Sequence, residues 1–285
     1  MKALITGANG QLGRALAARA PASIELVALT SAQLDIGDRA AVDAAFIEHA
    51  PTFVINAAAY TKVDVAEAMP ELANRVNNLG VAHLAQAAQR SGARMVHIST
   101  DFVFDGMASH PYRPDAPTAP LNVYGATKLA GERAAGQNAL IIRTSWLYSP
   151  YGNNFAATML RLMRERPVLR VVDDQIGTPT SALSLADALW KLSVTDNVGV
   201  IHYSDSGVAS WYDFAVAIME DAVATGLLGQ PVEIIPIPSS AYPTPAKRPH
   251  YSVLDKCDTI EALGYAPPHW RASLRDVLEA IKFDG

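Results

Sequence analysis

The sequence is poor in the features that disulfide frameworks, metal clusters and membrane spans require. Its 285 residues include one cysteine, Cys257, so neither a disulfide within the chain nor a zinc or iron–sulfur site of several cysteines can form. It has no run of about 18 consecutive apolar residues, which a membrane helix needs, and the apolar stretch Ala3–Ile5 is too short for a secretory signal. We therefore expect a cytoplasmic protein, since thiols stay reduced there, and no membrane partner.

Neither sign of charge is present in large excess. Lys and Arg number 23 and Asp and Glu 28, which gives a net charge of −5. The basic surface that marks nucleic-acid binding is therefore not expected. The chain is 50% hydrophobic and 18% charged, a balance typical of folded globular domains rather than of disordered chains. Its length leaves room for one large domain or two modest ones.

Short β-branched runs alternate with Ala-rich helical patterns through the first half of the chain. Strands are expected at 3–6, 24–29, 53–56, 95–99 and 140–143, with helices over 11–19, 39–49, 70–91 and 125–137. This alternation predicts right-handed strand–helix–strand units and a parallel sheet covered by helices on both faces. The predicted fold class is therefore α/β, a Rossmann-like doubly wound parallel sheet with the strand order 3-2-1-4-5.

The second half of the chain is less regular. Six prolines between Pro231 and Pro249 exclude a single regular element there. We predict a Rossmann domain over residues 1–150 and a smaller C-terminal lobe, which would bind substrate, over residues 151–285, with some later segments returning to the first domain. In this half, helices are expected near 154–166, 182–193 and 211–224, and strands at 169–172 and 200–203.

Three glycines, Gly7, Gly10 and Gly13, follow the first strand and open the first helix. In dinucleotide-binding folds the first glycine allows a tight turn, the second lets the backbone approach a pyrophosphate, and the third lets helix and strand pack closely. The free N–H groups and the dipole of the helix N-terminus attract the anion. A strand-to-helix turn uses glycine in any case, but the place of this one after the first strand favours a dinucleotide site.

The end of the second strand leaves the choice between NADH and NADPH open. An acid or an arginine usually stands there to read the ribose, whereas this chain has Thr30. Asp35, a little further on, either caps the adenine side of the cofactor or belongs to the loop before the helix that Asp38 caps. After the third strand, small residues would let the backbone approach a cofactor, although they also suit a tightly packed strand end. Ala59 and Thr61 are candidate contacts there.

An acid–base pair is predicted at Tyr124 and Lys128, whose spacing of four residues puts both on one helix face. A free tyrosine has a pKa of about 10, and a nearby ammonium favours the phenolate and lowers that pKa. Thr100 ends the fourth strand, which neighbours the first in the order 3-2-1-4-5. Its hydroxyl would therefore face a cofactor bound over the glycine turn and hold a substrate carbonyl near Tyr124.

Together these motifs resemble the extended short-chain dehydrogenase/reductase superfamily and, within it, the dTDP-4-dehydrorhamnose reductase family. The glycine turn is common to the superfamily, whereas the longer motifs are specific to the reductase family. The resemblance runs over nearly the whole chain. Its matching stretches are 56–64, 99–106, 120–125, 127–132, 143–148, 152–155, 174–180 and 242–249.

The resemblance implies a role for each matching residue. By it, Tyr124 is the proton donor, Lys128 is the partner that tunes its pKa and binds the ribose, and Thr100 orients the keto group. Trp146 is implied as the aromatic that stacks on the thymine base. The remaining implied substrate contacts are Asp101 and Asn154. The implied cofactor contacts, besides Tyr124 and Lys128, are Gly7, Gly10, Gln11, Leu12, Gly13, Asp35, Ile36, Ala59, Tyr60 and Thr61.

The resemblance also implies a reaction and its partners. The substrate would be a dTDP-sugar, dTDP-4-dehydro-6-deoxy-L-mannose, which NADPH or NADH would reduce to dTDP-L-rhamnose in the last step of dTDP-rhamnose biosynthesis. Some members bind magnesium at a dimer interface through glutamates, one of them in the first helix. Ala15 stands at that position here, which argues against the metal and that mode of dimerisation, while a homodimer as such stays open.

Three other functions are kept as alternatives, of which the first is the reduction of another nucleotide sugar. Epimerases and dehydratases of the superfamily recycle a tightly held oxidised cofactor, and Asp101 beside Thr100 could supply the carboxylate that a dehydratase needs. Regulatory subunits related to this family bind NADP and a partner enzyme without catalysis. The presence of Thr100, Tyr124 and Lys128 argues against a regulatory subunit.

The remaining polar and aromatic signals predict structure rather than chemistry. The histidines show no metal-ligand spacing, and His97, inside a strand, is expected in the core. Cys257 has no identified base nearby. Trp211 and Tyr212 are expected to pack in the core or in the smaller lobe.

Overall fold

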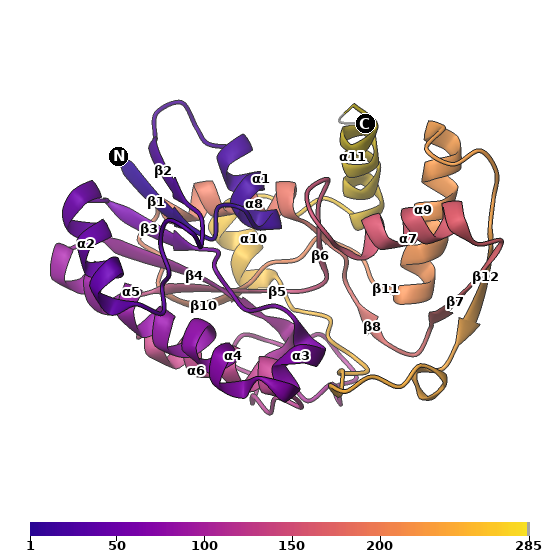
Figure 1. Ribbon diagram of the computed structural model, residues 1–285, viewed down its shortest axis with the longest axis horizontal. Helices are drawn as coiled ribbons and strands as arrows, with labels where there is room; N and C mark the ends of the chain where they lie inside the picture. Colours follow the sequence, from indigo (N-terminus) through magenta and orange to yellow (C-terminus); the bar gives the residue numbers. More distant parts are fainter. Residues whose placement is uncertain (284–285) are drawn as a thin grey trace.

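The computed structural model describes residues 1–283 and has a six-stranded parallel sheet at its centre (Figure 1). Its strands are continuous runs of apolar, β-branched residues. Such runs are expected because helices cover both faces of the sheet, so that side chains on either face are buried. From one edge to the other the strands are β2 (Glu25–Leu29), β1 (Lys2–Thr6), β3 (Phe53–Asn56), β4 (Arg94–Thr100), β5 (Leu140–Thr144) and β10 (Gly199–His202).

This sheet confirms the α/β, Rossmann-like fold class but corrects the strand order. In chain order the first five strands lie as 2-1-3-4-5, so β3 lies between β1 and β4. Only β2 lies beyond β1, because after β2 the chain crosses back and β3 pairs with the other edge of β1. The point where the winding reverses, at which doubly wound sheets bind ligands, is therefore between β1 and β3.

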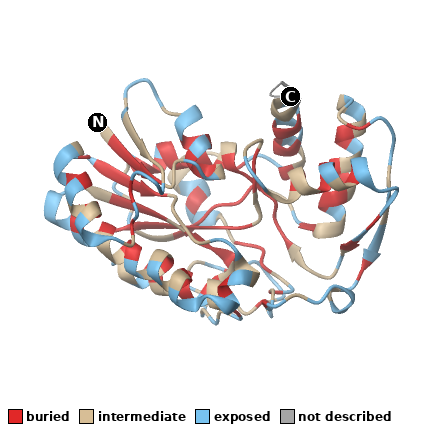
Figure 2. Cartoon of the chain, in the orientation of Figure 1, coloured by how far each residue is buried: buried red, intermediate tan, exposed pale blue. Residues whose placement is uncertain are grey.

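Helices cover the two faces of the sheet (Figure 1). On one face α1 (Gln11–Ala18) packs against α8 (Ala182–Ser193), which in turn contacts α10 (Cys257–Leu263). On the other face α5 (Gly80–Ser91) packs between α2 (Arg39–His49) and α6 (Val123–Ala135). Figure 2 shows the strands buried between them, with the exposed residues on the outer sides of the helices.

The helix predicted over 70–91 is interrupted. It consists of α4 (Pro70–Asn74), a π-helical turn η1 (Arg75–Leu79) and α5. The turn carries the fully buried Asn77, which hydrogen-bonds to a residue of α6. A further helix that was not predicted, α3 (Val63–Ala68), leads into α4.

The C-terminal half builds a smaller lobe with its own hydrophobic core. Three helices contribute to that core, α7 (Phe155–Glu165), α9 (Trp211–Thr225) and α11 (Trp270–Phe283). Short strand pairs frame the lobe and its junction with the sheet: β7 (Val168–Val172) with β12 (Glu233–Ile237), β8 (Ile176–Gly177) with β11 (Ala209–Ser210), and β6 (Leu147–Tyr148) with β9 (Thr180–Ser181). The short 3₁₀ turns are η2 (Asp101–Val103) and η3 (Ser239–Ala241).

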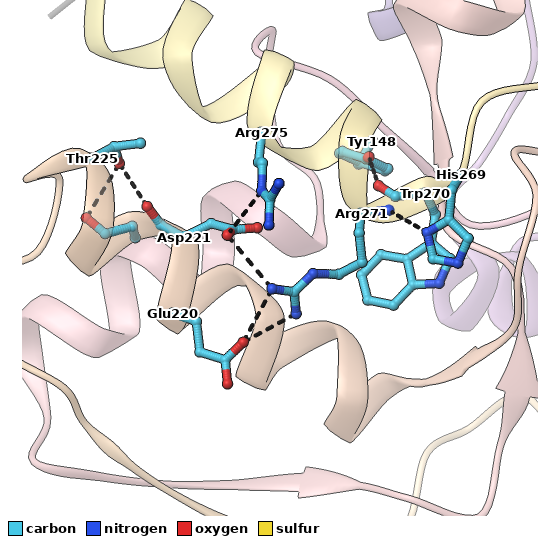
Figure 3. Close-up of polar contacts among 9 residues, drawn as sticks. Tyr148, Glu220, Asp221, Thr225, His269, Trp270, Arg271 and Arg275 are labelled. Carbon is cyan, nitrogen blue, oxygen red and sulfur yellow. Dashed lines mark hydrogen bonds and ion pairs between the residues drawn. The ribbon is translucent and has the colours of Figure 1, made fainter.

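Two arginines tie α11 to α9 on the outside of the lobe (Figure 3). Arg271 lies 3.1 Å from Glu220 and 3.5 Å from Asp221. Arg275 approaches the same Asp221 oxygen at 3.4 Å. The two guanidinium groups thus converge on a carboxylate that is only 9% exposed, while Arg275 itself stays 63% exposed.

Several C-terminal segments lie with the sheet rather than with the lobe. β10 pairs with β5, and α8 and α10 cover one face of the sheet. The division at residue 150 stays a prediction. Among the helices of residues 1–283, none is both long and apolar enough to cross a membrane.

Candidate active site

The glycine turn leads from β1 into α1 at the carboxyl end of the sheet. Gly7 has a φ of +69°, and a Cβ there would lie 2.7 Å from the backbone of Ala58, in the loop after β3. A Cβ on Gly13 would lie 2.3 Å from the Gly7 carbonyl oxygen. Gly10 occupies the N-cap position of α1. The backbone N–H groups in the first turn of this helix have no side-chain cap, and that turn holds no acidic residue. The turn therefore leaves donors for an anion.

The loop after β3 is fixed by a residue that the sequence analysis missed. Asn77 accepts a hydrogen bond from the Tyr60 backbone N–H at 2.8 Å and donates to the Tyr60 carbonyl at 3.1 Å. It also donates to the Thr127 hydroxyl on α6 at 3.1 Å. Asn77 thus couples the expected cofactor loop, Ala59–Thr61, to the helix of Tyr124. Its position inside a π-helical turn is the kind of irregularity that often marks a functional site.

Thr100 ends β4 and begins the turn η2. Its hydroxyl donates to Asp101 Oδ1 at 2.9 Å and accepts from the Phe102 N–H at 3.2 Å. Both Thr100 and Asp101 are buried. Burial raises the pKa of the Asp101 carboxyl to about 6, against the opposing effect of hydrogen bonds from Ser252 and Thr100. A carboxyl with this pKa exchanges its proton near neutral pH.

Tyr124 lies in the first turn of α6 and reaches Thr100. A Cβ on Gly125 would lie 2.2 Å from the Phe102 carbonyl oxygen, so glycine lets the start of α6 approach η2 closely. The Thr100 hydroxyl lies close enough to the Tyr124 phenol to act against the rise of its pKa. The Tyr124 ring also packs edge-on against Phe102, with ring centres 5.5 Å apart. The hydroxyl and the phenol that the sequence singled out are therefore in contact.

The electrostatics of the pair differ from the expectation. Burial raises the pKa of Tyr124 to about 12, and the nearby Asp101 carboxylate adds to that rise. The sequence analysis expected Lys128 to lower this pKa, but the Lys128 ammonium donates to the Ile98 carbonyl at 2.5 Å. Desolvation of the phenolate therefore sets the direction of the shift. Burial also lowers the pKa of Lys128 to about 8, partly offset by Glu132 one turn further along α6.

A buried ion pair lies behind α6, the helix that carries Tyr124 and Lys128. Glu132 on α6 and Arg143 on β5 are each 5% exposed, and two hydrogen bonds of 2.8 and 2.7 Å join them. Ser99, next to Thr100 on β4, donates to Glu132 at 2.5 Å. These contacts lock α6 onto β4 and β5, so the positions of Thr100 and Lys128 depend on a network that solvent does not reach.

His97 is a core residue, as expected. It is fully buried on β4, and burial together with the charge of Lys128 holds its pKa well below the ordinary value. Asn56 contacts His97 Nδ1 at 3.1 Å and accepts a hydrogen bond from Thr6 at 2.6 Å. The neutral imidazole thus joins β4 to β3 and β1 beneath the loops of the site.

The remaining expected cofactor residues lie apart from the Thr100–Tyr124–Lys128 cluster. The Asp35 carboxylate accepts from Arg75 and from the Gly37 N–H, so the loop interpretation of Asp35 has a clear structural basis. Ile36 is buried under α5, where a Cβ on Gly80 would meet it. Leu12, in the first turn of α1, is buried, and Gln11 accepts a hydrogen bond from Ser149 at 3.0 Å.

The expected substrate contacts beyond β5 are engaged with the protein itself. Asn154 caps α7 by accepting from the Ala157 N–H and donates to the Ser149 carbonyl. The Trp146 ring stacks on Trp211, with ring centres 3.6 Å apart and planes 3° from parallel. The sequence analysis treated these two tryptophans separately, since Trp211 lies 65 positions after Trp146 in the chain.

Comparisons with known proteins agree with this fold and identify the family. The family model described as "RmlD substrate binding domain" matches residues 1–283. The chain is 42% identical to the spore coat polysaccharide biosynthesis protein SpsK of Bacillus subtilis, over 98% of this chain and 97% of that protein. It is 41% identical to a dTDP-4-dehydrorhamnose reductase of Aggregatibacter actinomycetemcomitans, over 96% and 97%. It also resembles the crystal structure of a Bacillus anthracis dTDP-4-dehydrorhamnose reductase in complex with NADP, with a TM-score of 0.93 and 37% identity over 98% and 99%.

Proposed function

The chain belongs to the RmlD substrate binding domain family, and from that membership we propose that it reduces dTDP-4-dehydro-6-deoxy-L-mannose to dTDP-L-rhamnose with NAD(P)H. This would be the last step of dTDP-rhamnose biosynthesis. The observation that carries the proposal is the contact between Thr100 and Tyr124 at the carboxyl edge of the sheet, with Lys128 one helical turn away. Ligands bind at this edge in doubly wound folds.

Tyr124 would act as the proton donor. When bound, the reduced nicotinamide supplies a hydride to the C4 carbonyl carbon. The phenol of Tyr124 gives its proton to the oxygen of the same carbonyl, and Thr100 holds that oxygen by a hydrogen bond. Because burial raises the pKa of Tyr124 to about 12, the phenol keeps its proton at neutral pH and is ready to give it to an alkoxide. This is the protonation state that a reduction needs.

Lys128 would hold the cofactor ribose and supply positive charge close to the phenol. Its ammonium bonds the Ile98 carbonyl and retains further donors. Since burial lowers its pKa to about 8, the cation predominates at neutral pH. The positive charge would offset negative charge that remains on the Tyr124 oxygen after proton transfer.

The residues present fit a dinucleotide. The α1 N-terminus has free N–H groups and no acid in its first turn, and Gly7 and Gly13 leave no side chain in the turn. Ala59, Tyr60 and Thr61 follow β3 at the reversal of the winding. The NADP of the Bacillus anthracis relative and the absence of an acid at Thr30 support NADPH as a cofactor, and the preference over NADH is a question for the assay.

The test is cofactor consumption on the 4-keto sugar nucleotide. We expect the nicotinamide absorbance to fall by one equivalent of NADPH or NADH for each dTDP-L-rhamnose formed. An epimerase or dehydratase would give product with no net loss of reduced cofactor, and a regulatory subunit would give no product. Either result would reject the reductase proposal. Parallel runs with the two cofactors measure the preference.

Other expectations stay predictions. They include the substrate contacts Asp101, Trp146 and Asn154, a cytoplasmic location, the lack of a nucleic-acid partner, and a homodimer. The argument against magnesium still rests on Ala15, which is buried in α1. Metal analysis and sedimentation of the purified protein test the last two points.

A further inference from the structure

Trp146 is held in an unusual backbone conformation at the junction of sheet and lobe. It lies between β5 and β6 with a φ of +46°, one of two non-glycine residues with positive φ among residues 1–283. Such a conformation is uncommon for a bulky residue and persists where the surroundings enforce it. Its carbonyl accepts from the Thr180 N–H at 3.1 Å, and the preceding Ser145 hydroxyl donates to the Thr178 carbonyl at 2.9 Å.

The protein covers both faces of the Trp146 indole. A Cβ added to Gly177 would lie 2.6 to 2.8 Å from Cε2, Nε1 and Cζ2 of the ring. Three bonded atoms at nearly equal distances mean that the Gly177 backbone lies over the ring face rather than beside its edge. Trp211 stacks in parallel at 3.6 Å and would collide with that Cβ if it were on the same side. Trp211 therefore covers the other face.

The two groups that cover the Trp146 ring, the Gly177 backbone and the Trp211 side chain, differ in how easily they can be displaced. Gly177 belongs to β8, which pairs with Ala209 of β11, so its backbone is part of a strand ladder. Trp211 covers the ring with a side chain alone. One hydrogen bond, from its Nε1 to the Gln175 side chain at 3.2 Å, and packing against Phe155 at 4.6 Å hold the indole. A rotation of the Trp211 side chain can expose Trp146, whereas removal of Gly177 would break the strand pair.

The resemblance implies that the planar base of the proposed substrate stacks on Trp146, for which one face of that indole must be free. Resting on the proposed function, we propose that Trp211 occupies the position of the nucleotide base on Trp146 and leaves it when the base binds. Trp211 is then a competitor built into the nucleotide subsite. The stack keeps Trp146 aligned for the base, and the base must replace one indole–indole contact.

The direction of the effect distinguishes this proposal from a purely structural stack. If Trp211 competes with the base, its removal strengthens nucleotide binding. If the stack merely supports Trp146, the same change weakens binding. An aromatic pair contributes about 0.5–1.5 kcal/mol, which corresponds to about a 2- to 13-fold change in Kd.

The first experiment measures the Kd of dTDP by calorimetry on the full chain. We expect Trp211→Leu to lower the Kd by about 2- to 10-fold and Trp211→Phe to lie between it and the parent. Trp146→Leu should raise the Kd by at least the same factor. Tyr212→Leu, which removes the half-buried aromatic next to Trp211, is the matched control and should leave the Kd unchanged. An unchanged or raised Kd in Trp211→Leu would overturn the proposal.

A second measurement does not depend on the stability of any variant. Two parallel indoles in contact couple their electronic transitions and give an exciton couplet in far-ultraviolet circular dichroism. In the parent protein, dTDP should abolish this couplet, with the spectrum of dTDP-bound Trp211→Leu as the baseline. A couplet that persists at saturating dTDP would reject the exchange.

Failure of this inference and failure of the proposed function are separable. If the parent consumes NADPH on the 4-keto sugar nucleotide but Trp211→Leu binds dTDP no better, the exchange is rejected and the reductase proposal stands. If the parent shows no consumption but binds dTDP with loss of the couplet, the exchange stands and the reductase proposal is rejected.

Discussion

One ion pair in the body around the sheet and one cluster of charges on the smaller lobe differ in how far solvent reaches them. Behind the catalytic helix, Glu132 and Arg143 are paired at 5% exposure each. In the lobe, Arg271 and Arg275 reach Glu220 and Asp221 from the surface, and Arg275 is 63% exposed (Figure 3). Breaking a buried pair leaves an uncompensated charge in a low dielectric, whereas an exposed pair is screened by water.

This difference fits the tasks that we assign to the two regions. Proton transfer between Tyr124 and a carbonyl depends on small displacements, and the network around Glu132 fixes the helix that carries the phenol. The lobe contributes aromatic rings such as Trp211, which can rearrange without breaking a buried ion pair. On the proposed function, the proton transfer would therefore take place beside the buried network and nucleotide binding at the edge of the lobe.

The largest effect is expected from Tyr124→Phe, which removes the proton donor and leaves the ring. A positioned acid contributes about 10²–10⁴ in rate, so kcat should fall by that factor while the Kd values of dTDP and NADPH stay within about twofold. Steady-state kinetics and calorimetry measure the two quantities. Near-normal turnover at saturating substrate would show that the chemistry does not depend on this phenol.

Arg143→Met should unfold the protein more easily than any charge removal in the lobe. It leaves the Glu132 carboxylate buried without its cation, which costs about 3–5 kcal/mol of unfolding free energy. Urea denaturation measures the loss, with Arg271→Met as the matched lobe variant. In the double variant Glu132→Leu with Arg143→Met, much of the stability should return. Equal losses for Arg143→Met and Arg271→Met would abolish the contrast between the two regions.

Gly177→Ala should weaken nucleotide binding more than turnover. The new methyl group would lie 2.6 Å from Trp146 Cε2 and displace the ring from its stack. Overpacking of this kind costs about 1–3 kcal/mol, and we expect KM for the sugar nucleotide to rise by about 5-fold or more with kcat at saturation nearly unchanged. Gly229→Ala, with open space around its Cβ, is the control. A fall in kcat with constant KM would place the effect at the chemical step instead.

The pH dependence of kcat/KM tests whether Lys128 or Tyr124 titrates in the working range of the protein. Lys128, whose pKa burial lowers to about 8, is a cation below that pH and neutral above it. If its charge is needed, kcat/KM should fall about tenfold per pH unit above about pH 8. The phenol, with a pKa of about 12, stays protonated throughout. Lys256→Met, a change at a half-buried lysine outside the site, should keep this limb, and a flat profile from pH ~7 to ~10 would contradict the role of Lys128.

The smallest effect is expected from Arg275→Ala in the lobe. Its guanidinium is mostly exposed, and Arg271 remains to pair Asp221. Pairs of this kind contribute about 0.2–1 kcal/mol, and added salt should reduce the difference further. Urea denaturation at two salt concentrations measures it. A loss as large as that of Arg143→Met would mean that the lobe also depends on a desolvated ion pair.

The sequence predicted most of the secondary structure because the periodicity of apolar residues is local. The helices expected over 39–49 and 182–193 have those bounds in the structure. The order of strands in the sheet is not a local property, because the sequence of a run such as Phe53–Asn56 does not tell on which side of β1 that strand pairs. The position of β3 was therefore wrong, although Thr100 still lies at the carboxyl edge of the sheet.

The candidate site divides along the same line. Tyr124 and Lys128 are close in the chain, so one helical turn predicts their common face. Asn77 forms hydrogen bonds with partners 17 and 50 positions away in the chain. In the sequence it looks like any other asparagine that could cap a turn, so nothing singles it out. The Trp146–Trp211 stack and the raised pKa of Tyr124 depend on burial, which no spacing rule supplies.

The route of the chain through β10 has a consequence for how the protein can be cut. This edge strand comes from residues 199–202, after α7 of the lobe and before α9 and α11, and it pairs along β5. A fragment that stops at residue 150 would present β5 as an open edge, with free N–H and C=O groups ready to join another chain. The halves are thus interlaced through one hydrogen-bonded ladder, and neither is a module that gene fusion or truncation could move alone.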